Sequence, residues 1–371
     1  MIPFAISQPP RIRFGRGEAR AALPEIAALG RRAVVVHGRD AERTAWLGEG
    51  LHALGVAVTR LACPREPTLD MLEAALPSAR GADVVVAVGG GAAIDLGKAV
   101  AALAPAPGSA LDHLEVVGLG RPLRHAPLPF VAIPTTAGTG AEVTKNAVID
   151  VPEHRRKVSL RDERMIARLA VVDPVLTDHC PKGVTLGSGL DALVQVIEPY
   201  VSLRANPYTD ALCRAAIPVG LAALRRLMAS EDPEARDAMA WVSLCGGLAL
   251  ANAGLGAVHG LAGVIGGMTG APHGAICGAL LPHVLRMNAA RAPSDRHAEV
   301  ADRITEAFGA GGIAAFEAWI HDQGLPRLSA FGLASADHAP VANAALGASS
   351  MKANPAPLPA ADLISILQAA G

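Results

Sequence analysis

The sequence predicts an α/β domain built on a parallel sheet, followed by an all-helical domain. In the first half of the chain, short β-branched runs alternate with segments of helical periodicity. Continuous apolar strands separated by helices are typical of a parallel sheet that is covered on both faces. After about Thr185 the strand patterns disappear and only helical patterns remain. With a boundary near Pro181-Lys182-Gly183, we expect an α/β domain over residues 1–183 and a helical domain over residues 184–371.

Four apolar runs are the strand candidates of the first domain, at residues 33–37, 56–59, 83–88 and 129–133. Residues 42–54 and 69–79, which lie between them, carry apolar residues at helical spacing and are predicted helices. The third strand leads directly into Gly89-Gly90-Gly91, and the fourth leads into Pro134-Thr135-Thr136. Both loops therefore follow the carboxyl end of a strand, which is where open α/β sheets bind ligands.

Helical patterns dominate the second half, at residues 210–228, 233–253, 273–288 and 294–308. No Asp, Glu, Lys or Arg occurs from Ala238 to Leu285, but glycine pairs, Pro272 and three histidines interrupt this run. A membrane-spanning helix needs about 20 unbroken apolar residues, so buried helices around a site are the better interpretation. The Pro/Ala-rich residues 353–360 predict a loop before a last short helix.

The composition excludes several classes of protein. Hydrophobic residues make up 51% of the chain and charged residues 18%, which argues for an ordered globular protein. The formal net charge of −1 gives no support for binding to nucleic acid or to an anionic membrane. Five scattered cysteines without Cys-x-x-Cys spacing, and an N-terminus without a secretory signal pattern, predict a cytoplasmic protein with reduced thiols.

The glycine turn is a candidate phosphate-binding site. Gly89, Gly90 and Gly91 would let the backbone approach a pyrophosphate at the start of a helix, although their spacing is not Gly-x-Gly-x-x-Gly and also suits a plain tight turn. Asp95 and Lys98 share one face of the following helix, either beside a bound nicotinamide and its phosphates or as a surface ion pair. The next loop, likewise a possible simple turn, offers hydroxyls to ribose and phosphate from Thr135, Thr136, Thr139 and Thr144.

Taken together, these segments resemble the iron-containing (group III) alcohol dehydrogenase family, which includes maleylacetate reductases and is related to glycerol dehydrogenase and dehydroquinate synthase. The resemblance runs almost end to end and follows the order of the chain. Its motifs are Phe14-Gly15-Arg16-Gly17, the glycine turn, the loop from Pro134 to Thr144, Val172-Asp173-Pro174, Asp191-Ala192 with Ile197-Glu198, Asn206-Pro207-Tyr208-Thr209-Asp210-Ala211, and His273-Gly274 with Leu281-Pro282-His283.

The resemblance implies a dinucleotide on the α/β domain, a metal in the helical domain, and a cleft between the two. The residues that it places at the dinucleotide are Gly90, Gly91, Asp95, Thr135, Thr136, Thr139, Thr144 and Lys157. Gly89 and Lys98 join this candidate set from the pattern of the glycine turn and the helix that follows it. Those that it places at a metal are Asp191, Gln195, His259 and His273, of which the two histidines are also the candidate catalytic residues. Relatives of this kind imply a homodimer or a larger homo-oligomer.

The choice between NAD and NADP depends on the residues after the second strand. Many family members have an acidic residue there, which would hold the ribose 2′-hydroxyl and repel a 2′-phosphate. This chain has Gly38 followed by Arg39, whose guanidinium could bind that phosphate. We therefore expect a preference for NADPH over NADH. The alternative is that Arg39 points to solvent and Asp40 contacts the ribose.

Two departures from the family pattern affect the metal site. Gln195 stands where the family has a histidine ligand, and Gly263 stands where it often has a proton-relay histidine. Three explanations remain open: Fe²⁺ or Zn²⁺ binds through Asp191, His259 and His273; the histidines work without a metal; or the chemistry is lost. We expect any metal to be bound weakly, and Gln195→His to raise the affinity.

The expected activity is the reversible NAD(P)H-dependent reduction of a small aldehyde or ketone to an alcohol. The proton would have to come from water, from a cofactor hydroxyl or from His273, because Gly263 cannot supply it. Three alternatives stay open: a metal-independent oxo-acid reductase resembling maleylacetate reductase, a lyase or cyclase resembling dehydroquinate synthase, and a nucleotide-binding protein without catalysis. No nucleic-acid or membrane partner is expected.

Overall fold

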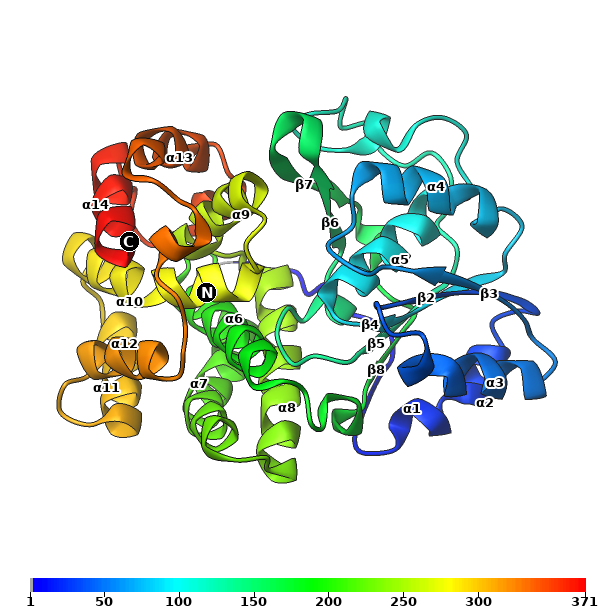
Figure 1. The fold of residues 1–371 in the computed structure, drawn as a ribbon, viewed down its shortest axis with the longest axis horizontal. Coiled ribbons are helices and arrows are strands. Elements are labelled where there is room, and N and C mark those ends of the chain that lie inside the picture. Colours follow the sequence, from blue (N-terminus) through cyan, green and yellow to red (C-terminus); the bar gives the residue numbers. More distant parts are fainter. Residues whose placement is uncertain (1–2) are drawn as a thin grey trace. The chain divides into compact units, whose positions relative to one another are not determined.

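The chain folds into an α/β unit and a helical unit, which confirms the predicted fold class (Figure 1). The computed structural model describes residues 3–371. The α/β unit comprises Ser7–Thr136 and Gly140–Thr177. The helical unit comprises Asp178–Gly371 together with residues 3–6 and Ala137–Thr139. The loop from Pro134 to Thr144, here called the threonine loop, thus has its tip in the helical unit. The sequence-based division instead cuts the chain only once, at residue 183.

A six-stranded parallel sheet forms the centre of the α/β unit. Its strands run in the order β1 (Ile12–Phe14), β8 (Leu169–Val172), β5 (Phe130–Pro134), β4 (Val84–Gly89), β2 (Arg32–His37) and β3 (Ala57–Ala62). The four predicted strands are β2 to β5. The two edge-side strands β1 and β8 were not predicted, because runs of three and four residues carry too little pattern. In the register, His37 pairs with Val88 and Gly89 pairs with Pro134, so the loops that follow β2, β4 and β5 emerge at the same edge.

Successive residues of the central strands enter different cores, as the two-residue period of a strand requires. Val35 and Val86 pack with α1 (Glu18–Ala21), α2 (Leu23–Ala27) and α3 (Ala45–Ala53) on one face. On the other face, neighbouring strand residues pack against α4 (Leu69–Ala79) and α5 (Gly91–Leu103), as the ribbon shows (Figure 1). Because both faces are covered, the strands are apolar throughout rather than alternating.

A separate antiparallel hairpin, β6 (Asn146–Val151) with β7 (Arg156–Arg161), packs beside α5. The sequence analysis did not predict it. Its signal is the alternation of buried Ala147, Ile149 and Val151 with partly exposed residues, which is the pattern of a strand with one buried face. The short η3 turn (Ala141–Val143) connects the threonine loop to this hairpin.

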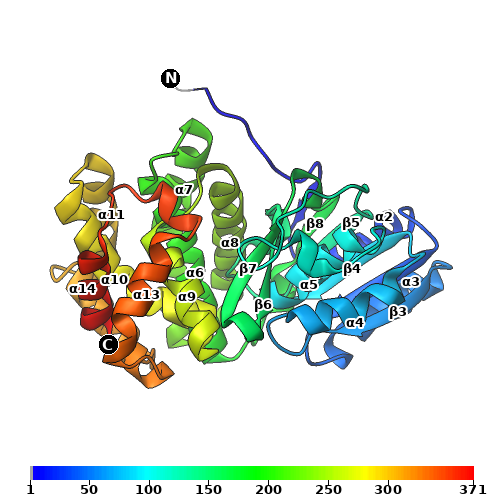
Figure 2. The ribbon, with the colours of Figure 1, turned by 90° about the horizontal axis from the view of Figure 1, so that it is seen from above.

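The helical unit is organised around α6 (Lys182–Val201), whose residues from Gly189 to Val201 are all buried. The helices α7 (Pro207–Ala229), α8 (Pro233–Ala253) and α10 (His273–Arg291) pack directly against it. Asn206 starts α7 with a capping box and Pro207 occupies the first helical position, so the helix begins a few residues before residue 210, where the sequence analysis placed its start. The unit is completed by α9 (Ala257–Thr269), α11 (Asp295–Phe308), α12 (Ile313–Asp322), α13 (His338–Leu346) and α14 (Ala360–Ala370) (Figure 2).

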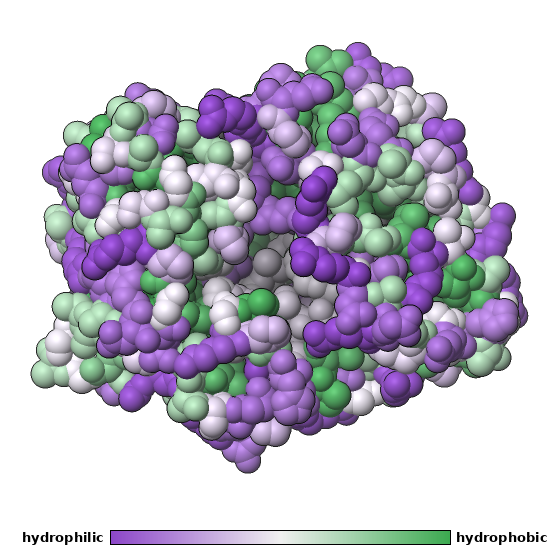
Figure 3. Space-filling view, in the orientation of Figure 1, coloured by the Kyte–Doolittle hydropathy of each residue, from purple (hydrophilic) through white to green (hydrophobic). Residues whose placement is uncertain are grey.

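The four helices predicted in the second half correspond to α7, α8, α10 and α11, and the last short helix to α14. Within residues 3–371, no single helix is long and apolar enough to cross a membrane; α8 and α9 meet that test only as a pair bent by 101°. The face drawn in Figure 3 carries hydrophilic residues interspersed with hydrophobic ones.

Gly97 lies where α5 packs closely against the sheet, so a substitution there probes how tight this contact is. A Cβ at this position would lie 2.7 Å from the Ala87 Cβ and 3.1 Å from a ring carbon of Phe130. We expect Gly97→Ala to lower the free energy of unfolding by about 1–3 kcal/mol through overpacking. The measurement is urea unfolding followed by circular dichroism.

The matched control is Gly48→Ala in α3 of the same unit, where the nearest atom to a new Cβ is 3.9 Å away. That change should leave stability unchanged or raise it by up to about 1 kcal/mol, because alanine is the better helix former. Equal effects of the two substitutions would show that the tight contact at Gly97 does not limit the packing of α5.

Candidate active site

The glycine turn joins β4 to α5 at the edge of the sheet where the strands end. A Cβ on Gly89 would lie 2.6 Å from the Ala93 Cβ and 3.4 Å from the backbone nitrogen of Gly38, and one on Gly90 would lie 3.4 Å from the Thr136 Oγ1. Gly89 is therefore required for close approach, whereas a side chain at Gly90 would make a contact of nearly ordinary length, and neither residue has a left-handed backbone. No side chain caps α5 and its first turn holds no acid, so its first N–H groups can bind an anion.

The residues predicted at a dinucleotide gather at this edge only in part. Thr136 packs beside Gly90, Thr135 donates its backbone N–H to the Gly89 carbonyl oxygen at 2.9 Å, and Gly38 lies beside Gly89. Thr139 belongs to the loop tip that packs with the helical unit. Lys157, on β7, pairs with Glu66. Contacts of these residues with a cofactor stay a prediction.

Arg39 follows directly on Gly38 and is exposed. Its Nε and one terminal nitrogen each lie 3.4 Å from the Pro64 carbonyl oxygen, which are long contacts that leave the guanidinium weakly held. Asp40 instead accepts a hydrogen bond from the backbone N–H of Glu42 at 3.0 Å. Arg39 is therefore the side chain of this pair that is more readily available to a phosphate.

Lys98 is not half of a surface ion pair, and that alternative is wrong. Its side chain is 1% exposed, and its Nζ donates to the carbonyl oxygens of Ala141 and Asn146 and to the Thr144 Oγ1, at 2.7, 2.8 and 2.8 Å. Asp95 accepts a hydrogen bond from the backbone N–H of Val148 at 3.1 Å. Both residues thus tie α5 to the threonine loop and the β6–β7 hairpin.

A buried carboxyl, Glu142, lies within the electrostatic reach of Lys98. Burial raises the pKa of Glu142 to about 7, although the Lys98 charge acts in the opposite direction. Burial likewise raises the pKa of Asp95 to about 6 and lowers the pKa of Lys98 to about 8, and the attraction between the two opposes both shifts. The loop that carries Thr144 is therefore anchored by a cluster whose charges depend on pH.

The helical unit brings Asp191, His259 and His273 together. The Asp191 Oδ1 lies 3.4 Å from the His259 Nε2 and 3.7 Å from the His273 Nε2. Asp191 comes from the middle of α6, His259 from the first turn of α9 and His273 from the first residue of α10. Asp191 and His259 have side chains only 2% and 8% exposed, whereas that of His273 is 32% exposed. Three of the four predicted metal ligands, Asp191, His259 and His273, thus have donor atoms suited to a metal close to one another.

Small residues explain how α6 and α10 come so close. A Cβ on Gly274 would lie 2.3 Å from the Gly187 carbonyl oxygen and 3.3 Å from the Asp191 Cβ. One turn later, a Cβ on Gly278 would lie 2.5 Å from a methyl carbon of Leu190. Because the two helices touch through backbone, the side chain of His273 reaches the Asp191 carboxylate.

Glu198 is a functional candidate that the sequence analysis named only within a motif. Its Oε2 lies 2.7 Å from the His259 Nδ1, and its Oε1 accepts a hydrogen bond from the backbone N–H of Val258 at 2.7 Å. The Nδ1 is thereby occupied, so His259 presents its Nε2 to Asp191. The available signal was spacing, because Glu198 lies seven residues after Asp191 and thus on the same face of α6.

The fourth predicted position, Gln195, is 2% exposed, and its Nε2 donates to the Gly138 carbonyl oxygen at 3.3 Å, while its Oε1 has no hydrogen-bond partner. Gly263 lies one turn after His259 on α9, with open space where a side chain would begin. Cys277, which the sequence analysis did not select, joins Asp191, His259 and His273 in a group whose ligand atoms all lie within 4.8 Å of one another.

The electrostatics of this centre favour a positive charge. Burial works to raise the pKa of Asp191, but the imidazoles of His273 and His259 outweigh it and the pKa is lowered. Burial works to lower the pKa of His259, yet the carboxylates of Asp191 and Glu198 outweigh it and raise the pKa to about 9. Two buried carboxylates around one imidazole thus stabilise a cation, whether a proton or a metal ion.

The Glu142 cluster should make stability depend on pH. The pKa of Glu142 is about 7 in the folded chain against an ordinary value of 4.5. The folded state therefore retains this proton to higher pH, and the stability associated with it is lost as the pH rises through that window, by about 1.4 kcal/mol per pKa unit. Glu142→Gln should remove this loss, so the stability difference between wild type and variant should change between about pH 5 and about pH 8.

The measurement is urea unfolding at both pH values, with the exposed Glu153→Gln as the control, which should follow the wild type at each pH. A constant difference between wild type and Glu142→Gln at the two pH values would show that Glu142 does not titrate in this range.

Comparison with known proteins identifies the family. Residues 9–174 match the iron-containing alcohol dehydrogenase family, and residues 185–371 match the C-terminal domain of the Fe-containing alcohol dehydrogenase family. A solved structure of 1,3-propanediol oxidoreductase matches with a TM-score of 0.92 and 29% identity, covering 100% of both chains.

Two curated relatives match a shorter part. Long-chain-alcohol dehydrogenase 1 of Geobacillus thermodenitrificans is 42% identical over 59% of this chain and 56% of its own length. The NAD-dependent methanol dehydrogenase of Bacillus methanolicus is 38% identical over 60% of this chain and 58% of its own length. The chain thus spans somewhat more than half the length of these two relatives. Its parallel-sheet unit, its helical unit and these matches together show that the protein belongs to the iron-containing alcohol dehydrogenase family.

Proposed function

We propose that this protein catalyses the reversible NAD(P)H-dependent reduction of a small aldehyde or ketone to an alcohol. The observation that carries the proposal is the buried centre of Asp191, His259 and His273, because its donor atoms converge on one point and its charge favours a cation. Family membership supports the same class of reaction, since the curated relatives are named as alcohol dehydrogenases.

The dinucleotide site of this proposal is the edge formed by the glycine turn. The first N–H groups of α5 would bind the pyrophosphate, because Gly89 and Gly90 keep side chains away from the approach. Thr136, beside Gly90, would donate its hydroxyl to the same group. Lys98 would act indirectly by holding Thr144 and the Ala141 carbonyl oxygen in place, since its three donors are occupied by protein acceptors.

The residues of the helical centre fit a divalent metal. Within residues 3–371 the buried Asp191 Oδ1 has no hydrogen-bond partner, which is costly unless an ion or another cationic group compensates it. Asp191, His259 and His273 would hold Fe²⁺ or Zn²⁺, both of which accept carboxylate and imidazole ligands. When bound, such an ion supplies a Lewis acid for the substrate carbonyl.

The protein's own groups would position the ligands and supply protons. Glu198 fixes the orientation of His259 through its Nδ1, as carboxylates that stand behind a ligating histidine do. No imidazole follows His259 at Gly263, so the proton for the product oxygen would come from solvent, past the open space at Gly263 and the exposed edge of His273.

The test is a screen for oxidation of NADPH and NADH with short aldehydes, ketones and oxo-acids, before and after chelation and reloading with Fe²⁺ or Zn²⁺. We expect turnover with an aldehyde or ketone, loss on chelation, and a fall of roughly a hundredfold or more for Asp191→Ala. Fluorescence titration of NADPH provides the control, because Asp191→Ala should still bind cofactor. Cofactor binding without turnover on any substrate or metal would contradict the proposal.

Arg39 should determine the preference for NADPH. Removing a guanidinium that binds the 2′-phosphate should lower the apparent affinity for NADPH roughly tenfold or more, because such a charged hydrogen bond contributes about 1.5–3 kcal/mol. Affinity for NADH should not change. The measurement compares cofactor KM values for the wild type and Arg39→Ala.

Arg43→Ala is the matched control, since Arg43 is also exposed and only four residues away. It removes the same charge from the same region and should leave the NADPH preference intact. An equal loss in both variants, or a wild type that prefers NADH, would mean that Arg39 does not recognise the phosphate.

A further inference from the structure

We propose that Cys277 takes the place of the missing histidine as the fourth metal ligand, so that the ion is held by Asp191, His259, His273 and the Cys277 thiolate. The inference rests on the metal binding of the proposed function and specifies its ligand set. His273 and Cys277 lie four residues apart at the start of α10 and therefore project from one face of the helix.

Distances support a four-coordinate site. The Cys277 Sγ lies 3.5 Å from the His273 Nε2, and the Asp191 Oδ1 lies 3.4 and 3.7 Å from the two imidazole Nε2 atoms. In a tetrahedral zinc site with metal–ligand bonds of about 2.0–2.3 Å, oxygen and nitrogen ligands are about 3.4 Å apart, and nitrogen and sulfur about 3.6 Å. The three separations therefore match those of ligands around one ion, and all four atoms fall within 4.8 Å.

Gln195 is the weaker candidate for this position. Its Nε2 donates to the Gly138 carbonyl oxygen, and the atom that could bind a metal is the neutral Oε1, a weaker donor to Zn²⁺ or Co²⁺ than a thiolate. Helix α8 also packs closely against this residue, since a Cβ on Gly246 would lie 3.0 Å from the Gln195 Cβ. Gln195 is therefore held in its contact with the loop, while a thiolate is a charged donor that Zn²⁺ and Co²⁺ bind well.

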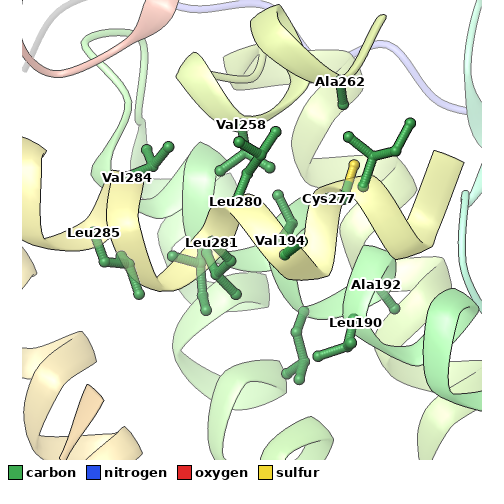
Figure 4. Close-up of a cluster of buried hydrophobic side chains, with 14 of the residues drawn as sticks. Leu190, Ala192, Val194, Val258, Ala262, Cys277, Leu280, Leu281, Val284 and Leu285 are labelled. Atoms are coloured by element: carbon green, nitrogen blue, oxygen red, sulfur yellow. The ribbon is translucent and has the colours of Figure 1, made fainter. Parts of the chain in front are cut away.

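The plain alternative is that Cys277 is only a small core residue. It is 0% exposed and lies in the apolar cluster with Val194, Val258 and Ala262 (Figure 4). Cys213 on α7 is equally buried in the same core, but it belongs to no metal-ligating group among the described residues. The two cysteines differ in one respect, the convergence on Asp191 and the histidines, and this difference makes Cys213 the matched control.

Coordination by Cys277 requires that the thiol lose its proton to solvent as the sulfur–metal bond forms. The ligand set then carries two negative charges, from Asp191 and Cys277, against the two positive charges of the ion. A thiolate also changes selectivity, because soft sulfur favours Zn²⁺ and Co²⁺ over Mn²⁺, which prefers oxygen. Loss of the sulfur should therefore lower the affinity of the site for Zn²⁺ and Co²⁺ more than its affinity for Mn²⁺.

The test is a titration of the metal-stripped full-length protein with Co²⁺, followed by absorption spectroscopy. The wild type and Cys213→Ala should show a near-ultraviolet thiolate-to-cobalt charge-transfer band together with visible d–d bands. Cys277→Ala should lose the charge-transfer band, keep d–d bands, and bind Co²⁺ more weakly by at least the roughly 10-fold to 100-fold that loss of a supporting residue costs. Circular dichroism confirms that each variant is folded.

A second variant keeps the proposal falsifiable if the first loses too much affinity. In the Cys277→Ala background, Gln195→His should restore Co²⁺ affinity without restoring the charge-transfer band, because an imidazole then fills the vacant position. Co²⁺ bound by the wild type without a charge-transfer band would overturn the role of Cys277 but leave the metal site standing. A wild type that binds no Co²⁺ at all would overturn the role of Cys277 and the metal site, while the turnover screen with NADPH and NADH would still decide the proposed reaction.

Discussion

The buried carboxylate of Asp191 is the constraint around which the helical unit is arranged. A carboxylate that is 1% exposed in an apolar core is costly unless positive charge or hydrogen bonds compensate it. Its Oδ1 has no hydrogen-bond partner in the part of the chain that the structure describes, so compensation comes from the imidazoles beside it and from any ion they bind. The helices α9 and α10 each contribute a histidine to this compensation from within their first turn.

Close backbone contact builds the metal-site candidate within the helical unit and, separately, the glycine turn within the α/β unit. In the helical unit, Gly187 and Gly274 let α6 and α10 touch, and this contact places His273 beside Asp191. In the α/β unit, Gly89 and Gly90 let the end of β4 approach its neighbouring loops. A methyl group on Gly274 would lie 2.3 Å from the Gly187 carbonyl oxygen, and one on Gly89 would lie 2.6 Å from the Ala93 Cβ, so the geometry at these two positions is sensitive to a single side chain.

Lys98 is a second buried charged residue, and it organises its neighbours in the α/β unit as Asp191 organises the histidines in the helical unit. Its three donors are all satisfied by protein oxygens from the threonine loop and β6. Removing Lys98 would leave these buried acceptors unsatisfied, which typically costs about 1–3 kcal/mol for each group. The loop that carries Thr144 is thus anchored to α5 by the Lys98 ammonium group as well as by its connection to the hairpin.

The sequence by itself determined the fold class, the four central strands, the long helices and the family, because these depend on local periodicity and on short motifs in order. It did not determine β1, β8 or the β6–β7 hairpin, whose short or mixed patterns are outweighed by tertiary pairing. Nor did it distinguish a surface Lys98 from a buried one, since helical spacing says which residues share a face but not what covers that face. Only the tertiary structure brought Glu198 and Cys277 to Asp191 and His259, because that meeting depends on how α6, α9 and α10 pack.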